Sequence, residues 1–222
     1  DGETYGHHKK FGDMALAYAL KEGFSSRGFE MINYGAFLKR FPAVYEVEID
    51  EGPKGEGTSW SCAHGVDRWK EDCGCSTGGR AGWNQKWRKP LREALDLLRD
   101  ELSSVFEREG EKIFKDVWEA RNGYIEVILD RSPERVKHFF ERVGVKGLDE
   151  ARRIEGLKLL EMQRHALLMY TSCGCFFAEL SGLETTQILQ YAARAIELAE
   201  ALTGQGIEAK FMKKLSEAKS NL

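Results

Sequence analysis

Hydrophobic and polar positions divide the chain into an amino-terminal stretch of short segments and a carboxy-terminal stretch of long helices. Apolar residues recur at spacings of three and four from Trp87 to Val105, which predicts a long amphipathic helix. The same period predicts three further helices, over 133–143 with Ser132 as its cap, over 150–170 and over 185–202. We therefore expect a helical bundle in the carboxy-terminal stretch.

The amino-terminal stretch indicates short mixed elements. Helical spacing predicts a helix over 13–24 with Asp13 as its N-cap, and a second short helix that ends near Pro42. Residues 31–34 have strand character, and in 44–49 polar and apolar residues alternate as in a half-buried strand. The expected fold class is mostly α, a helical bundle that follows a short α/β segment.

A long irregular loop joins the two stretches. Residues 51–82 hold eight glycines, one proline, three cysteines and two tryptophans. Structureless loops of this length inside compact domains are usually functional or tied down. We divide the chain accordingly into 1–57, a Cys/Trp/Gly-rich loop over 58–82, and a helical bundle domain over 83–222.

The composition is typical of a soluble globular protein, with 42% hydrophobic and 31% charged residues. No apolar run approaches the roughly 20 residues of a membrane span, so we expect no membrane partner. The net charge of -3 offers no excess of cations for phosphates, which excludes a nucleic-acid partner from our expectations. The odd count of five cysteines and the lack of a visible secretory signal favour a reducing cytoplasm.

The cysteines indicate a possible metal site. Cys62, Cys73 and Cys75, with His64 or Cys173 as the fourth ligand, could form the tetrahedral thiolate-rich site that structural zinc prefers. Free buried thiols are one alternative. A redox pair of Cys73 and Cys75 is another, and the sequence does not choose between these three.

The chain opens on residue types that suit acid/base chemistry, DGETYGHH, and has no initiator Met, which suggests a fragment or a processed product. Retaining glycoside hydrolases hold two carboxyl groups roughly 5 Å apart. On one strand, Asp1 and Glu3 would be about 7 Å apart, which is too far for that pair. Either these residues supply part of a catalytic site, or they form a polar turn before the first helix.

Tryptophans gather in and after the loop. Four of the five lie within the 28 positions 60–87. Their flat rings can stack on sugars or on other apolar surfaces. We take Trp60 and Trp69 as candidates for substrate binding, and expect Trp83 and Trp87 to anchor the loop to the long helix.

The opening DGETYGHH resembles the fourth conserved region of glycoside hydrolase family 57. The run FPAVYEVEIDEGPKGEGTSW resembles the approach to the family's fifth region, whose tryptophan lines the substrate cleft. The runs TSWSCAHGVDRWKEDCGC and QRHALLMYTSCG resemble an uncharacterised domain at the carboxy-terminal side of a subgroup of family-57-like proteins.

This resemblance implies the carboxy-terminal part of a retaining glycoside hydrolase or glucanotransferase that acts on α-glucan-like sugars. Asp1 would be the general acid/base, and Glu3 would contact the sugar. His7 would hydrogen-bond the sugar or orient Asp1, and Trp60 would stack on a ring. Residues 1–57 would complete a distorted β/α barrel, and catalysis would need no cofactor.

Two features depart from the family pattern. Family 57 takes its nucleophile, a Glu, from an earlier strand of the barrel, so the isolated chain is expected to be inactive without that amino-terminal barrel. Branching-type members of the family also lack the cysteines that follow Trp60 here. The rival hypothesis is therefore a non-catalytic, metal-pinned helical module that binds sugar or supports a partner domain.

Overall fold

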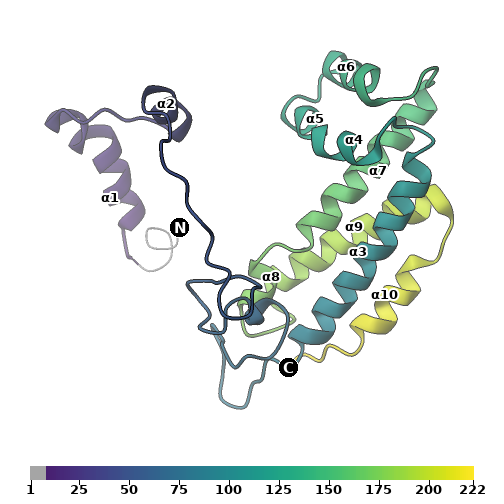
Figure 1. The fold of residues 1–222 in the computed structure, drawn as a ribbon. Coiled ribbons are helices and arrows are strands. Elements are labelled where there is room, and N and C mark those ends of the chain that lie inside the picture. Colours follow the sequence, from purple (N-terminus) through teal and green to yellow (C-terminus); the bar gives the residue numbers. More distant parts are fainter. Residues whose placement is uncertain (1–8) are drawn as a thin grey trace. The chain divides into compact units, whose positions relative to one another are not determined.

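The computed structural model of the chain describes residues 9–222, so the expectations for Asp1, Glu3 and His7 lie outside the described residues. The chain divides into two compact units, one up to Ile49 and the other over Asp50–Leu222. The helices are, in chain order, α1 Gly12–Tyr18, α2 Tyr34–Arg40, α3 Arg88–Gly110, α4 Val117–Gly123, α5 Ile125–Leu129, α6 Pro133–Val143, α7 Glu150–Leu168, α8 Cys173–Phe176, α9 Leu183–Thr203 and α10 Ile207–Leu215 (Figure 1).

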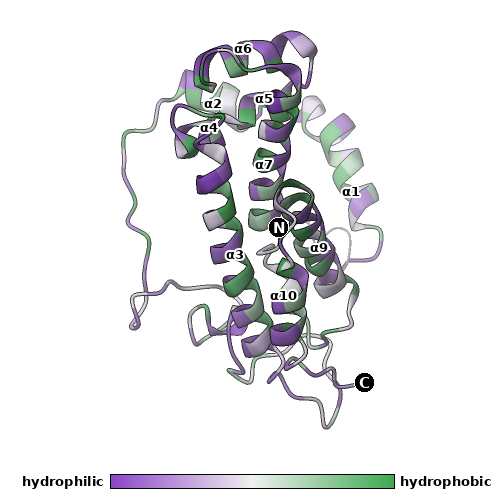
Figure 2. Ribbon diagram, turned by 90° about the vertical axis from the view of Figure 1, so that its right-hand side faces the viewer, coloured by the Kyte–Doolittle hydropathy of each residue, from purple (hydrophilic) through white to green (hydrophobic). Residues whose placement is uncertain are grey.

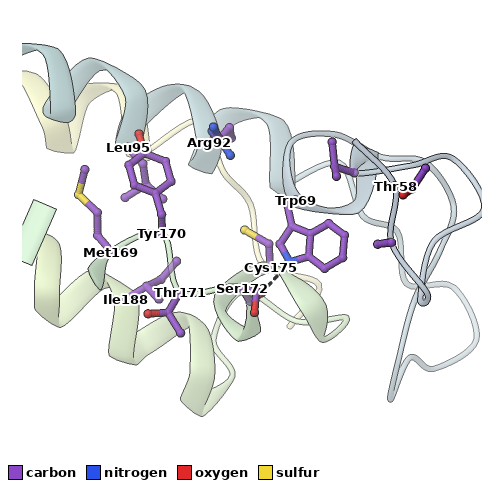
Figure 3. Close-up of a pocket in the computed structure, with 12 residues that line it drawn as sticks. Thr58, Trp69, Arg92, Leu95, Met169, Tyr170, Thr171, Ser172, Cys175 and Ile188 are labelled. Atoms are coloured by element: carbon purple, nitrogen blue, oxygen red, sulfur yellow. Dashed lines mark hydrogen bonds between the residues drawn. The ribbon is translucent and has the colours of Figure 1, made fainter. Parts of the chain in front are cut away.

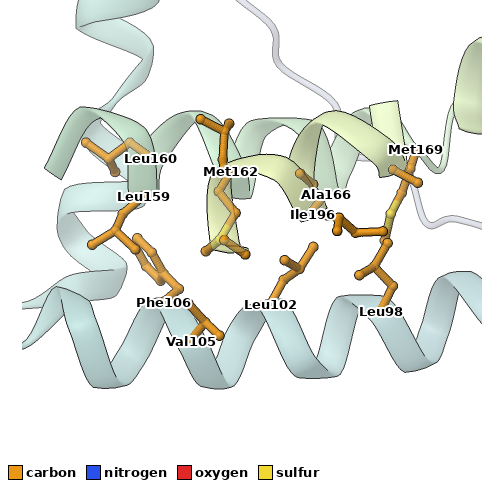
Figure 4. Packing of buried hydrophobic residues seen from close by; sticks show 14 of the residues in the cluster. Leu98, Leu102, Val105, Phe106, Leu159, Leu160, Met162, Ala166, Met169 and Ile196 are labelled. Atoms are coloured by element: carbon orange, nitrogen blue, oxygen red, sulfur yellow. The ribbon is translucent and has the colours of Figure 1, made fainter. Parts of the chain in front are cut away.

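The second unit is a helical bundle around α3, which packs against α7, α9 and α10. Its apolar stripe is fully covered: Leu91, Leu98 and Leu102 have no exposed surface. Figure 4 shows Leu98 and Leu102 facing Met162, Ala166 and Ile196 across the core. Burial of one such side chain contributes about 1.5–3 kcal/mol to folding. Because this burial recurs along α3, the spacing of its apolar residues predicts the helix.

The hydropathy of the bundle follows the same logic. Hydrophobic and hydrophilic residues alternate along α3 and α7, as expected for helices with one face in a core and one in water (Figure 2). The prediction of a mostly α fold with a helical bundle is therefore confirmed. No helix within residues 9–222 combines the length and apolar character needed to cross a membrane.

Side-chain caps fix where several helices begin. Ser132 accepts a hydrogen bond from the backbone N–H of Arg135, and Pro133 occupies the first turn, as predicted. Asp149 caps α7 and Asp116 caps α4 in the same way. The helices α4, α5, α8 and α10 were not expected from the sequence, because each is shorter than the long periodic segments that reveal a helix.

The amino-terminal unit corrects two expectations. Asp13 does not cap α1: the N-cap is Phe11, with φ 60° and no side-chain cap, and Asp13 lies in the first turn, where its charge complements the helix dipole. The predicted strands over 31–34 and 44–49 are wrong within the described residues, since Tyr34 begins α2 and the other positions have no regular structure. A strand needs a paired neighbour, and residues 9–49 present none.

The same unit has almost no interior. Of residues 9–49, only Gly12 and Gly23 are buried. Large apolar side chains that would normally form a core are instead exposed, among them Tyr34, Tyr45 and Val47 at 89% or more. Residues 9–49 are therefore held by helical hydrogen bonds and by local contacts such as the Arg40–Glu30 ion pair and the Phe24–Phe29 ring pair, rather than by burial.

Candidate metal centre

Four side chains of the loop over residues 58–82, within the second unit, converge on one point. The ligand atoms of Cys62, His64, Cys73 and Cys75 all lie within 4.8 Å of one another. Cys62 Sγ is 3.7 Å from Cys73 Sγ and 3.8 Å from His64 Nδ1, and Cys75 Sγ is 3.6 Å from the same nitrogen. The loop thus brings together the three predicted cysteines and selects His64 as the fourth member.

Three of the six pairwise separations have the values expected for a zinc tetrahedron, and all six are within 4.8 Å. Zinc–sulfur bonds of about 2.3 Å and zinc–nitrogen bonds of about 2.0–2.1 Å place ligand atoms roughly 3.8 Å apart for two sulfurs and roughly 3.6 Å for sulfur and nitrogen. The observed separations agree with both values to within a few tenths of an ångström. Cys173, the other candidate for fourth ligand, is exposed on α8 and lies outside the group.

Glycines allow the loop to fold around this point. Gly74, between Cys73 and Cys75, has φ 82°, a left-handed conformation that turns both thiols toward the same centre. At Gly65, a Cβ atom would lie 2.7 Å from the carbonyl oxygen of Gly57, so only glycine permits this approach of two loop segments. The glycine content that marked the region as irregular thus has a specific geometric use.

Hydrogen bonds from the backbone prepare the first thiol for a metal. Burial acts to raise the pKa of Cys62, but the backbone N–H groups of Arg68 and His64 donate toward its sulfur, and the net effect lowers its pKa to about 7. Burial raises the pKa of Cys73 to about 11, and its contact with the Cys62 thiol acts in the same direction. One thiolate is therefore favoured before a metal arrives, and a divalent cation would favour the others.

Two buried arginines lie beside the cluster. Arg88 has no exposed surface and donates from Nη1 to the carbonyl of Cys75 at 2.7 Å. Its Nη2 donates to the carbonyls of Phe176 and Phe177, each at 3.3 Å. Arg68 is 4% exposed, and its guanidinium lies 4.5 Å from the centre of the Phe176 ring.

Sequence reasoning missed both arginines, although a signal for one was available. Arg88 stands three residues before Leu91 and seven before Leu95, so it occupies the apolar stripe of α3. A cation on the apolar face of an amphipathic helix needs a special partner. Arg68 carries no comparable signal, because it lies in an irregular loop.

The tryptophans fall into two environments. Trp69 donates from its indole nitrogen to the carbonyl of Ser172 at 2.9 Å and lines a cavity of about 490 Å³ (Figure 3). Tyr170 and Arg92 line the same cavity. Trp60 is 81% exposed, lies outside this cavity and approaches the ring of Phe176 at 6.2 Å. The two candidate sugar platforms therefore do not share one pocket.

The remaining tryptophans of the cluster are structural. Trp87 is 1% exposed and belongs to the core, as expected for an anchor between the loop and the long helix. Trp83 is half-buried under the guanidinium of Arg80.

Comparisons with known proteins give one family. A family model described as "Domain of unknown function (DUF3536)" matches residues 83–222, more than half of the chain. No curated protein and no solved structure matches the chain. The match begins just after the cysteine loop and covers the whole bundle.

Proposed function

The chain belongs to the DUF3536 family, and we propose that its residues 50–222 form a non-catalytic helical module in which one structural zinc ion holds the loop. The observation that carries this proposal is the convergence of four ligand atoms, all within 4.8 Å of one another, of which three pairs have the separations expected around zinc. All four positions of the tetrahedron are filled by protein side chains, which is typical of structural rather than catalytic zinc.

The zinc would substitute for a core in this part of the module. Residues 50–82 contain only the short helical turn Asp67–Trp69 and bury few apolar side chains. A bound ion would fix four points of the loop and hold Trp60 and Trp69 in place beside the bundle.

Metal analysis of the purified chain tests this function. We expect close to one equivalent of zinc, and its loss in Cys62→Ser and in Cys73→Ser, because each removes a thiolate ligand. Cys173→Ser is the matched control, since that thiol is exposed and outside the cluster. A wild-type chain that takes up no zinc under reducing conditions would refute the proposal.

We also propose that the longer protein containing this module is a family-57-like glycoside hydrolase or glucanotransferase, with residues 9–49 contributing to its catalytic barrel. Two observations favour it: the resemblance of the opening motif, and the exposed apolar side chains of residues 9–49, which need a partner surface. The predicted strand over 44–49 would then form by pairing with that partner.

The proposed chemistry needs two carboxyl groups. Asp1 would protonate the glycosidic oxygen and later activate water or an acceptor sugar, while an upstream glutamate would attack the sugar carbon. Trp60, exposed at the surface of the loop, would stack on a ring of an α-glucan chain.

Two experiments test this second function. In a protein that includes the upstream barrel, Asp1→Asn should lower the rate of α-glucan cleavage or transfer by at least about a hundredfold, as expected for loss of a general acid. Full activity of that variant would sink the assignment. Calorimetry with maltoheptaose should show binding that Trp60→Ala removes, whereas Trp118→Ala, a substitution remote from the loop, should leave it intact.

A further inference from the structure

We infer that Arg68 and Arg88 are the buried counter-cations of an anionic metal centre, and that they set how tightly the centre holds zinc. This inference rests on the proposed zinc site and extends it from the ligands to the charges around them. It concerns two residues that make no contact with the metal themselves.

The first observation is an imbalance of buried charge. Arg88 and Arg68 are at most 4% exposed, yet neither forms an ion pair with a carboxylate within residues 9–222. The nearby Asp67 carboxylate forms ion pairs with two lysines instead, at 2.6 Å from Lys54 Nζ and 3.7 Å from Lys70 Nζ. Burial first, and repulsion from Arg68 second, hold the pKa of Arg88 below its usual range, against attraction from Cys73, Cys175 and Asp72. A buried cation without an adjacent anion is costly, so a further negative charge beside these arginines would stabilise them.

The second observation is the chemistry of the neighbouring ligand set. Three thiolates and a neutral imidazole on a divalent ion leave a single net negative charge. Arg88 donates to the carbonyl of the ligand residue Cys75 and to that of Phe176, and the guanidinium of Arg68 lies over the ring of the same Phe176. Arg88 thus lies at the edge of the group that would carry a negative charge, and Arg68 lies on the residue that Arg88 contacts.

The same imbalance discriminates between the states of the cysteines. A disulfide between Cys62 and Cys73, whose sulfurs are 3.7 Å apart, would be neutral, and so would three protonated thiols. Either state would remove negative charge from the sulfurs beside the two arginines. Zinc-bound thiolates hold that charge in place, so the arginines favour the metal-bound state over this disulfide and over protonated thiols.

The arginines also connect the metal loop to the bundle. Arg88 lies at the start of α3 and, through its three carbonyl contacts, links Cys75 to the carboxy-terminal end of α8 at Phe176 and Phe177. Arg68 covers Phe176 of the same segment. Zinc binding would therefore stabilise the contact between the loop, α3 and α8 as well as the loop itself.

Zinc affinity, measured by competition with a chromophoric chelator, tests the inference through two variants. Arg88→Gln removes the charge but keeps hydrogen-bond donors for the carbonyls. Arg68→Met removes the charge where the side chain makes no hydrogen bond within the described residues and keeps an apolar contact with Phe176. We expect each to weaken zinc binding by about tenfold or more. Arg152→Gln, on the exposed first turn of α7, should leave it unchanged.

A change of ligand charge separates electrostatics from simple structural damage. His64→Cys converts the centre to four thiolates and doubles its net negative charge, so the Coulomb attraction of each arginine grows. The penalty of Arg68→Met and Arg88→Gln should therefore be larger in the His64→Cys background than in the native one. A role in packing alone predicts equal penalties in the two backgrounds.

The outcomes are distinct. Wild-type affinity in both arginine variants, or equal penalties in both backgrounds, overturns the inference while the zinc site stands. A wild-type chain that binds no zinc overturns the zinc site and this inference together. If Arg88→Gln does not fold, Arg68→Met decides, because it leaves no carbonyl without its donor.

Discussion

The two units of this chain obey the same sequence rules and reach different results. In Asp50–Leu222, apolar residues at helical spacing are buried in one continuous core, with Leu91, Leu98 and Leu102 fully covered. In residues 9–49, residues of the same types and spacing stay exposed, and only two glycines are buried. Helical spacing of apolar residues therefore leads to helices in both units, whereas burial depends on whether a complementary surface is present.

Because of this difference in burial, the two units should contribute unequally to the stability of the protein. Hydrophobic burial is the main favourable term in folding, so the free energy of unfolding should reside in the second unit. The first unit should respond to mutation like a set of isolated short helices, which are marginal in water. Matched substitutions in the two units test this difference.

The largest expected effect is a core truncation. Leu102→Ala should lower the free energy of unfolding by about 2–5 kcal/mol, because Leu102 has no exposed surface and its loss leaves a cavity on α3. Tyr45→Ala, in a side chain that is 89% exposed, should change it by less than about 0.5 kcal/mol. Urea unfolding followed by far-UV circular dichroism measures both, and a large effect at Tyr45 would show that the first unit has a core after all.

The next effect concerns a buried carboxylate that fastens the end of the chain. Glu179, 9% exposed, accepts hydrogen bonds from the hydroxyl of Ser220 and from the backbone N–H groups of Asn221 and Ser181. Burial acts to raise its pKa, but these donors prevail and hold the pKa below its usual range. Glu179→Gln should cost about 1–3 kcal/mol at neutral pH.

The stabilisation that Glu179 contributes depends on pH. Because the pKa of Glu179 is lower in the folded state, its stabilisation is present above the unfolded pKa of about 4.3 and is lost as pH falls through the folded pKa. Unfolding curves between neutral and acidic pH should therefore converge for wild type and Glu179→Gln. In the first unit, Glu30 pairs with Arg40 at the surface, and Glu30→Gln should leave the transition unchanged.

A smaller effect on stability is expected from the loss of an N-cap, and it should differ between the two units. Ser132 caps α6 in the bundle, and Asn33 caps α2 in the first unit, each by accepting a backbone N–H. Ser132→Ala should lower the free energy of unfolding by about 1 kcal/mol. Asn33→Ala should reduce only the local helix content, seen as faster amide exchange over α2, because α2 contributes no core to the cooperative transition. Equal effects of the two substitutions on global unfolding would contradict the comparison.

The long helices could be predicted from the sequence, because they follow from the spacing of apolar residues. Features that depend on contacts between distant residues could not. The stripe from Trp87 to Val105 and the cap at Ser132 lead directly to α3 and α6. The cysteines, too, could be grouped from residue chemistry, but only folding selects His64 over Cys173 as the fourth member. The strand predicted over 44–49 failed because alternation describes half of a pair, and the other half is not among the described residues.

The smallest expected effect tests the exposed tryptophan of the metal loop. Trp60 is 81% exposed and its ring centroid lies 6.2 Å from that of Phe176, so Trp60→Ala should change the free energy of unfolding by less than about 0.5 kcal/mol. Trp87→Ala, in a side chain with 1% exposure, should cost about 3–5 kcal/mol under the same conditions. A large, exposed aromatic ring that adds nothing to stability is free to act as a platform for a ligand. If Trp60→Ala instead lowers stability as Trp87→Ala does, the ring packs within the module, and the case for a sugar platform at this position is lost.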